Sequence, residues 1–380
     1  MAHIVVVGGG VAGANVVRGL SGQLHPTKHK LTLITSRPQF VNLLWSLRVM
    51  ADPNAPLENL FMPYDNLFGH FPGEIKVASV KSIEETKGAR TGGIIILSTG
   101  EPIQYDVLVL ATGSVWEGLV NYPTDPEAYY AHVASWRKKI KEAENIVIAG
   151  GGPVGIELCG EIKDVYPDKS VTIVQGDRLL LNDVYPDKFR TQVVQRVRQR
   201  GVDIIFDDAI KGAPPAESGY TSIKTREGRE LPCDLLITCR GGGANTPYMK
   251  FLRPSPLTDR GYVKVQPTFE VLYHPGIFAL GDIVDLPEVK QLAKIDSGHA
   301  NVVVSNVMSF LNQEPMVRTY RGQIEIMAVS IGRERGISYL SMLWGITLGH
   351  WLTKTLKSRT LVIEKVRHTL GIESKLKLHI

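Results

Sequence analysis

Runs of apolar residues that end in glycine recur along the chain and predict its architecture. The first run, HIVVV at residues 3–7, and the second, IVIA at residues 146–149, each lead into three consecutive glycines. A helix-like stretch follows each time, in the second unit through Val165, and then another apolar run, at residues 31–35 and 170–175. Strand, glycine turn, helix and strand in this order open a βαβ unit with a parallel sheet. The sequence therefore predicts two such units.

Later apolar runs complete the two units. A helix is expected near residues 297–310. Residues 337–352 contain two glycines and a histidine and are shorter than the roughly 20 residues of a membrane-spanning helix, so strand and turn are expected there. The order of the runs indicates that the second unit is inserted into the first, which resumes near residue 260. The runs that close the units are YDVLVLA before Thr112-Gly113, CDLLITC before Arg240-Gly241 and GIFAL before Gly281-Asp282.

Both glycine turns have the spacing G-x-G-x-x-G. The first glycine permits the tight turn, the second lets a pyrophosphate approach the backbone, and the third lets helix and strand pack closely. The N-terminus of the helix adds positive potential. One copy would be weak evidence, because glycines follow strands for many reasons, but two copies predict two dinucleotide sites. The residues are Gly8, Gly10 and Gly13 in the first unit and Gly150, Gly152 and Gly155 in the second.

A carboxylate after a late strand indicates which dinucleotide the first unit binds. Asp282 ends the run GIFALGD and can accept hydrogen bonds from ribityl hydroxyls. A helix directly after it would point its N-terminus at a flavin, and helix capping would suit the same residue. Thr112-Gly113 gives a second place where the backbone can approach the cofactor closely.

The motifs G-x-G-x-x-G, A-T-G, G-x-G-x-x-G and G-x-F-A-x-G-D, in that order, resemble the pyridine-nucleotide–disulfide reductase superfamily. The chain is most similar to its apoptosis-inducing-factor-like branch, especially the ferroptosis-suppressor type, and next to type II NADH:quinone dehydrogenases. The similarity covers essentially the whole chain. Besides the glycines it rests on FVNLLWSLR at residues 40–48, Glu157 in GIEL, EIK at 161–163, HAN at 299–301 and KSR at 357–359.

The resemblance implies an α/β, glutathione-reductase-like fold with two Rossmann-like dinucleotide-binding domains and a small C-terminal α+β domain. The expected FAD-binding domain covers residues 1–115 and 260–320, the NAD(P)H-binding domain residues 116–259, and the C-terminal interface or membrane-associating domain residues 321–380. Members of the family pass electrons from NAD(P)H through FAD to quinone-type, ubiquinone-like acceptors at a membrane surface. Some carry 6-hydroxy-FAD.

Two residues are catalytic candidates through this resemblance. Glu157 opens the helix after the second glycine turn, where an acid would position the nicotinamide ring; a first-turn acid favoured by the helix dipole is the alternative. Lys357 stands where the family brings a lysine close to the flavin, and a cation there would stabilise the anionic reduced ring. One more charge in a basic tail is the alternative for Lys357. Arg48 and His299 are further candidates for cofactor contact, although a packed histidine suits His299 better.

The chain departs from the family pattern at both ribose positions. Thr35 stands where the first unit would carry an acid, so Arg37 is expected to hold the FAD pyrophosphate instead. Gln175 stands at the matching position of the second unit, with Arg178 close behind. An acid there would repel the extra phosphate of NADPH, so its absence leaves both NADH and NADPH open. Lys294 replaces an aromatic residue of close relatives and is a further candidate to reach the flavin.

The positive charge of the chain lies in its C-terminal part. The net charge is +5, and residues 321–380 carry ten Lys and Arg against four Asp and Glu. Such a tail suits an anionic surface, and its interleaved apolar residues suit a membrane interface, with packing against the FAD domain as the alternative. The residues concerned are Trp344, Trp351, Leu352, Leu356, Leu361 and Val362 among Lys354, Lys357, Arg359, Lys365 and Arg367.

The cysteines and the N-terminus limit the functions and cellular locations to be expected. The three cysteines, at positions 159, 233 and 239, form no C-x-x-C, which argues against a disulfide reductase, a disulfide framework and a metal site. The first strand leaves no room for a signal peptide, and Ala2 stands where myristoylation requires glycine. A cytoplasmic protein is expected, either free or peripheral on lipid droplets, the plasma membrane or the outer mitochondrial membrane.

These observations favour an FAD-dependent NAD(P)H:quinone oxidoreductase. A flavin-containing, pro-death protein that binds DNA or a partner with little turnover is the alternative. No basic patch with interleaved aromatic residues occurs in the body of the chain, so nucleic acid binding is not expected. Monomer and homodimer both remain open.

Overall fold

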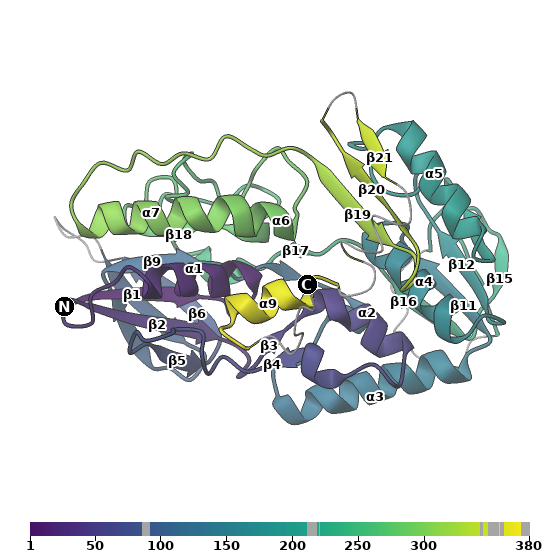
Figure 1. Cartoon of the computed structure of the whole chain (residues 1–380), viewed down its shortest axis with the longest axis horizontal. Coiled ribbons are helices and arrows are strands. Elements are labelled where there is room, and N and C mark those ends of the chain that lie inside the picture. Colours follow the sequence, from purple (N-terminus) through teal and green to yellow (C-terminus); the bar gives the residue numbers. More distant parts are fainter. Residues whose placement is uncertain are drawn as a thin grey trace, which may run out of the picture.

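The structure is a computed structural model of the chain (Figure 1). Two parallel sheets with flanking helices lie side by side, and a small antiparallel sheet packs against the helices of the second (Figure 1). The predicted α/β class with Rossmann-like parallel sheets is confirmed. The described residues are 1–85, 92–210, 219, 221–342, 345–348, 357 and 361–373.

The first sheet combines strands from distant parts of the chain. Its order is β18-β9-β1-β2-β5, and all of its pairs are parallel. The centre of the sheet is apolar, and Ile4, Val5 and Val6 have no exposed surface. Strand β18 joins this sheet although the whole second sheet precedes it in sequence. The strands are β1 (Ala2–Val7), β2 (His29–Thr35), β5 (Glu74–Val77), β9 (Val107–Leu110) and β18 (Ile277–Ala279).

Two helices pack together on this first sheet. Helix α1 (Val11–Ser21) follows the first glycine turn, and helix α7 (Ala300–Leu311) lies beside it (Figure 1). A Cβ on Gly19 would lie 2.9 Å from Cγ2 of Val304. A larger residue at position 19 would therefore push the helices apart.

The second sheet repeats the plan of the first. Its order is β13-β12-β11-β16, again with parallel pairs only. Helix α4 (Pro153–Val165) follows the second glycine turn and ends at the predicted residue. Proline at its first position suits a helix start, because the missing N–H would have no partner in the helix. The other elements are β11 (Asn145–Ala149), β12 (Ser170–Val174), β13 (Val202–Ile205), β16 (Leu235–Thr238) and α5 (Asp187–Arg198).

Short elements connect the sheets. The run predicted as one strand at residues 105–111 is broken at Asp106, whose carboxylate accepts a hydrogen bond from the His3 amide at 2.7 Å. The chain crosses between the domains twice, through β10 and β17, which pair antiparallel. The elements outside the two parallel sheets also include β3 (Phe40–Val41), β4 (Phe61–Met62), β6 (Val80–Glu85), β7 (Gly93–Leu97), β8 (Pro102–Tyr105), β10 (Ser114–Val115), β14 (Ser222–Lys224), β15 (Glu230–Pro232), β17 (Gly243–Ala244), α2 (Leu43–Ala51) and α3 (Pro126–Glu142).

The C-terminal part forms a small antiparallel sheet of β19 (Ile326–Ser330), β20 (Gly336–Leu340) and β21 (Ile346–Leu348). Strand and turn were predicted for residues 337–352, and the described part of that stretch confirms them. Helix α9 (Ile363–Thr369) returns to α1 of the first domain. No helix among the described residues is long and apolar enough to cross a membrane.

Helix α4 joins the three parts of the molecule through a row of carboxylates. The acids stand at positions i, i+4 and i+7, which share one face of a helix. Each one binds a group from a different element. Glu157 accepts from Lys357 of the C-terminal part, Glu161 from Arg48 of α2, and Asp164 from the backbone amide of Arg333 in the turn between β19 and β20.

The central pair of this row is a buried ion pair between domains. Arg48 Nη2 lies 2.8 Å from Glu161 Oε1, Arg48 Nε also donates to this carboxylate, and each side chain is 3% exposed. Burial raises the pKa of Glu161, and the Arg48 guanidinium opposes that shift. Burying two charges is costly, so the pair stabilises the fold only while both partners are present.

We expect Glu161→Ala to lower the free energy of unfolding by about 3–5 kcal/mol, because Arg48 would be left buried without its counter-charge. The double variant Arg48→Met/Glu161→Leu should recover most of that loss. Urea unfolding followed by tryptophan fluorescence measures both. A double variant as unstable as the single one would contradict this account.

Candidate functional site

The first glycine turn has the geometry of a dinucleotide cradle. Gly8 has φ +113°, and a Cβ there would lie 2.3 Å from the Ala111 carbonyl oxygen. A Cβ on Gly13 would lie 1.8 Å from the Gly8 carbonyl oxygen. A Cβ on Gly10, in contrast, would meet nothing within 4 Å. The protein therefore needs Gly8 and Gly13 for its own packing, whereas Gly10 borders open space at the N-terminus of α1, where a phosphate would lie.

The second turn repeats this geometry. Gly150 has φ +125°, and its Cβ would lie 2.7 Å from the Cys239 carbonyl oxygen. A Cβ on Gly155 would lie 2.1 Å from the Gly150 carbonyl oxygen, and one on Gly152 would meet nothing within 4 Å. Both turns thus fit a dinucleotide pyrophosphate in the same way.

The domain crossing brings Thr112 and Gly113 against the second crossing strand. Thr112 Oγ1 donates to the Asn245 carbonyl oxygen at 2.6 Å, and the Asn245 amide donates to the Gly113 carbonyl oxygen at 2.9 Å. Gly113 has φ +69°, and a Cβ there would meet nothing within 4 Å. The backbone at Gly113 is therefore open to a ligand, while the Thr112 hydroxyl holds the crossing together.

Asp282 does not cap a helix and no α-helix follows it directly, which corrects the expectation from the sequence. It lies in a short 3₁₀ turn, Gly281–Ile283, and helix α6 (Leu292–Lys294) begins ten residues later. The helix then continues through a π-helical turn, Ile295–His299, into α7. Asp282 Oδ2 accepts from Ser114 Oγ at 2.9 Å. The carboxylate thereby lies beside the first crossing strand, and its role toward ribityl hydroxyls stays a prediction.

Lys290 lies next to Asp282 and was not predicted. Its Nζ donates to the Asp282 carbonyl oxygen and lies 3.5 Å from the centre of the Tyr262 ring. Burial lowers the pKa of Lys290 to about 8. A lysine in a loop carries no spacing signal, so the sequence could not single it out.

His299 is a packed histidine with both ring nitrogens engaged. Nδ1 accepts from the Gly281 amide at 3.3 Å, so Nε2 carries the proton and faces Glu288 Oε1, also at 3.3 Å. Its ring lies 4.7 Å from those of Phe269 and Tyr320. Burial lowers its pKa. The neutral ring therefore supports the turn at Gly281, and direct contact with a cofactor stays a prediction.

Lys294 is turned away from the solvent into an acidic cluster. It is 1% exposed, and its Nζ lies 2.5 Å from Glu325 Oε1 and 3.4 Å from Glu288 Oε2. Gln291 Nε2 donates to Glu325 and to Tyr185 of the second domain. This cluster ties the start of α6 to the C-terminal part and to the second domain.

One of the residues that line a small cavity beside this cluster has an unsatisfied acceptor. Gly281, Asp282, Gln291 and His299 are among the residues that line it. Gln291 Oε1 is buried and has no hydrogen-bond partner among the described residues. Buried polar atoms normally have a partner, so an N–H donor of a bound ligand would suit this position. A flavin ring carries such a donor, and the cavity borders the Asp282 turn.

Glu157 and Lys357, the two catalytic candidates, form an ion pair, and their roles toward the nicotinamide and the flavin stay predictions. Lys357 Nζ lies 2.6 Å from Glu157 Oε1 and 2.7 Å from the Ala328 carbonyl oxygen. The same carboxylate oxygen accepts from the Ser330 amide at 3.2 Å. The side chains are 16% and 10% exposed. The pair lies one helical turn beyond the second glycine turn, and two hundred residues of sequence separate its members.

The ribose position of the first unit is closed by a tyrosine. A Cβ on Gly9 would lie 2.6 Å from Thr35 Oγ1 and 2.3 Å from Tyr64 Oη, and Tyr64 donates to the Gly9 carbonyl oxygen at 2.7 Å. Arg37 donates through Nε to the Pro123 carbonyl oxygen at 2.9 Å. Arg37 is thus anchored beside the turn, and its role on the pyrophosphate stays a prediction. Nothing in the sequence marked Tyr64.

The ribose position of the second unit is engaged by the protein itself. Gln175 Oε1 accepts from the Gly151 amide at 2.8 Å, and its Nε2 donates to the Leu179 carbonyl oxygen at 3.2 Å. Arg48, the remaining candidate, has its guanidinium on Glu161, as described above. Its assignment to cofactor binding therefore stays a prediction.

The model of the pyridine nucleotide-disulphide oxidoreductase family matches residues 2–302 of the chain. The chain belongs to this family. It is 41% identical over 323 residues to the FAD-dependent oxidoreductase FVFD30 of Flammulina velutipes, a match that covers 85% of this chain and 99% of that protein. It is 27% identical over 375 residues to the ferroptosis suppressor protein 1 of Taeniopygia guttata, covering 97% and 96%. The predicted resemblance is confirmed.

Solved structures show the same fold. The sulfide:quinone oxidoreductase of Aquifex aeolicus superposes with a TM-score of 0.76 at 19% identity, covering 97% of this chain and 92% of that one. A putidaredoxin reductase in covalent complex with putidaredoxin gives a TM-score of 0.68 at 20% identity, with 89% and 81% covered.

Membership establishes the general chemistry. The protein is a flavin-dependent oxidoreductase of a family that uses FAD and NAD(P)H. The two open turns at Gly10 and Gly152 fit these two dinucleotides. Cys159, Cys233 and Cys239 are all buried and form no disulfide, and no two of them have the spacing C-x-x-C.

The glycine geometry predicts two separable defects. Gly10 and Gly152 have φ of −77°, which alanine tolerates, so Gly10→Ala and Gly152→Ala should fold normally. Gly10→Ala should be purified with little flavin. Gly152→Ala should keep its flavin and raise the KM for the nicotinamide nucleotide roughly tenfold or more, because the methyl displaces the pyrophosphate. Absorbance at 450 nm and steady-state kinetics measure these effects. Full flavin content in Gly10→Ala would contradict the assignment.

Proposed function

We propose that the protein transfers electrons from NADH or NADPH, through FAD, to a quinone-type acceptor at a membrane surface. The proposed flavin is FAD, either unmodified or as 6-hydroxy-FAD. The observation that carries it is the Lys357–Glu157 pair, which brings a cation of the C-terminal part to the N-terminal half of α4, the helix that follows the second glycine turn.

The pair orders the reaction centre. Hydride chemistry itself is supplied by the nicotinamide and the flavin when they are bound. Lys357 has three N–H donors, of which two bind Glu157 and the Ala328 carbonyl oxygen. Glu157 holds Lys357 and at the same time receives the Ser330 amide. A lysine held in this way keeps a positive charge where the reduced ring would be negative, at little cost of reorganisation.

A quinone-type acceptor agrees with the cysteine pattern. Electrons would leave the flavin directly, because the sequence contains no C-x-x-C pair to receive them. The structural neighbour from Aquifex aeolicus acts, by its name, on a quinone. Its likeness in fold supports a similar acceptor for this chain.

A membrane surface agrees with an exposed apolar rim on the C-terminal sheet. Ile326, Leu340 and Ile346 are cross-strand neighbours at one end of the sheet, and Ile326 and Ile346 are each 37% exposed. Ile324 and Met342 extend the rim, at 46% and 50% exposed. Such a group on one surface suits an apolar phase from which a lipid-soluble acceptor is taken. Peripheral attachment of a cytoplasmic protein would follow.

The described part of the tail does not contribute to this surface. Leu361 is 2% exposed, and Arg367 Nη2 donates to Asn59 Oδ1 at 2.9 Å. Lys365 pairs with Asp296. These contacts support packing on the FAD domain, the alternative to the membrane, for this part of the tail. Trp344, Trp351, Leu352, Lys354, Leu356 and Arg359 lie outside the described residues.

Anaerobic stopped-flow mixing with NADH or NADPH should bleach the flavin, and a short-chain ubiquinone should restore its absorbance. Lys357→Met should retain flavin and slow its reduction roughly a hundredfold, since the charge facing the reduced ring is lost. Lys365→Met removes a charge from the same tail and should react like the wild type. If neither nucleotide reduces the flavin, or if quinone fails to reoxidise it, the proposal is wrong.

Co-sedimentation with liposomes tests the rim. Ile326→Ser/Ile346→Ser should reduce the bound fraction, because two apolar side chains no longer enter the interface. Val77→Ser changes an exposed apolar residue outside the rim, 52% exposed on β5 of the first sheet, and should bind as the wild type does. Equal binding of all three proteins would argue against the rim as the contact surface.

A further inference from the structure

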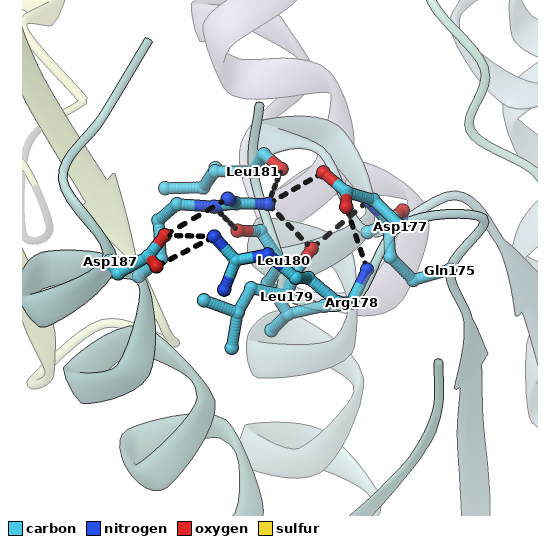
Figure 2. Close-up of polar contacts among 9 residues, drawn as sticks. Gln175, Asp177, Arg178, Leu179, Leu180, Leu181 and Asp187 are labelled. Carbon is cyan, nitrogen blue, oxygen red and sulfur yellow. Dashed lines mark hydrogen bonds and ion pairs between the residues drawn. The ribbon is translucent and has the colours of Figure 1, made fainter. Parts of the chain in front are cut away.

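Polar contacts hold the loop after β12 in place (Figure 2), and the Leu181 amide and the Gln175 side chain join it to Gly151 of the second glycine turn. Arg190 of α5 is 1% exposed, and it donates to the carbonyl oxygens of Leu179, Leu180 and Leu181 at 3.0–3.2 Å. It also binds Asp177 Oδ2 at 2.7 Å. Four hydrogen bonds from the buried Arg190 guanidinium fix the backbone of the loop. They thereby fix the positions from which its side chains extend.

This loop leads away from the adenosine ribose position. Gln175 marks that position, because β12 ends just before it and its side chain binds the amide of Gly151 within the glycine turn. Both ends of its amide are used by the protein. A carboxylate here would bind the ribose 2′-hydroxyl and repel a 2′-phosphate. Gln175 does neither, so another residue must select between NADH and NADPH.

Arg178 is the cation closest in sequence to that position, and it is accessible. Its side chain is 59% exposed, and its Nη2 binds both carboxylate oxygens of Asp187, at 2.6 and 2.8 Å (Figure 2). Asp187 is itself 54% exposed. Exposed ion pairs contribute little to stability, whereas a guanidinium binds a phosphate through strong paired hydrogen bonds. Exchange of Asp187 for a phosphate is therefore favourable.

Asp187 would keep a counter-charge after such an exchange. Arg190 Nη1 lies 3.4 Å from Asp187 Oδ1, and Asp187 stands in the first turn of α5, where the helix dipole favours an acid. Asp177 also accepts from Arg190 and from the Arg178 backbone amide, at 2.7 Å each. Both acids therefore keep hydrogen bonds to Arg190 when Arg178 is released, and the single charge of Arg190 balances one of their two negative charges.

We propose that Arg178 selects the nicotinamide nucleotide by exchanging Asp187 for the 2′-phosphate of NADPH. Gln175 permits the exchange because it carries no charge, and Arg190 positions the loop for it. This rests on the proposed function only in assigning the second glycine turn to NAD(P)H. The chain then uses NADPH at least as well as NADH.

Isothermal calorimetry of the holoprotein with 2′,5′-ADP and with 5′-AMP tests this without any hydride transfer. The wild type should bind 2′,5′-ADP about tenfold more tightly or better, since the phosphate gains charge-assisted bonds. Arg178→Met should abolish that difference and leave 5′-AMP unaffected. Gln175→Glu should also weaken 2′,5′-ADP selectively, and the KM ratio of NADPH to NADH should rise in both variants.

Arg198→Met is the matched control. It removes one exposed arginine from the same domain, at the far end of α5 from Asp187, and should keep the preference for 2′,5′-ADP. Equal binding of both mononucleotides by the wild type, or an undiminished preference in Arg178→Met, would overturn the proposal. So would failure of both to bind, which would also remove the nucleotide site. A flavin that no nucleotide reduces, with 2′,5′-ADP still preferred, would instead refute only the proposed activity.

Discussion

In both dinucleotide-binding domains, the third glycine of the turn lies against the first so closely that no side chain fits between them. A Cβ at Gly13 or Gly155 would lie 1.8 or 2.1 Å, respectively, from the carbonyl oxygen of Gly8 or Gly150. This contact fixes the helix against the strand, and so it aims the helix N-terminus at the open side of the turn. The position of each dinucleotide, and with it the meeting of the two redox rings, depends on this approach.

The second requirement is that the two domains and the C-terminal sheet keep a constant arrangement. Helix α4 meets it with carboxylates on one face: Glu161 binds Arg48 of the first domain, and Glu157 binds Lys357 of the C-terminal part. The backbones also approach closely, since a Cβ on Gly160 would lie 2.3 Å from the Gly332 amide. Helix α4, which begins at the second glycine turn, therefore also holds the three parts of the molecule together. A change in its position would move the cradle and the Lys357 ammonium together.

Local sequence patterns predicted much of this architecture. The apolar runs, the two glycine motifs and the end of α4 at Val165 follow from periodicity and spacing, and the structure agrees with them. The pairing of Glu157 with Lys357 was not predicted, although the resemblance names both residues as catalytic candidates and the spacing of the acids on α4 is visible in the sequence. The helix expected directly after Asp282 was wrong, because the chain first forms a 3₁₀ turn and a loop before α6 begins. Helix propensity does not show where the chain leaves a sheet for the layer of helices that covers it.

The sequence by itself determined the fold class, the two dinucleotide turns and the absence of a C-x-x-C motif, because these depend on residues close together in the chain. Only the tertiary structure decided which groups hold the side chains around those turns. Tyr64 closes the Thr35 position, Arg190 clamps the loop of Arg178, and Glu325 draws Lys294 into a buried cluster. Each of these contacts joins segments whose separation in sequence carries no period or motif. Their geometry exists only once the sheets have packed, because packing alone brings such residues within bonding distance.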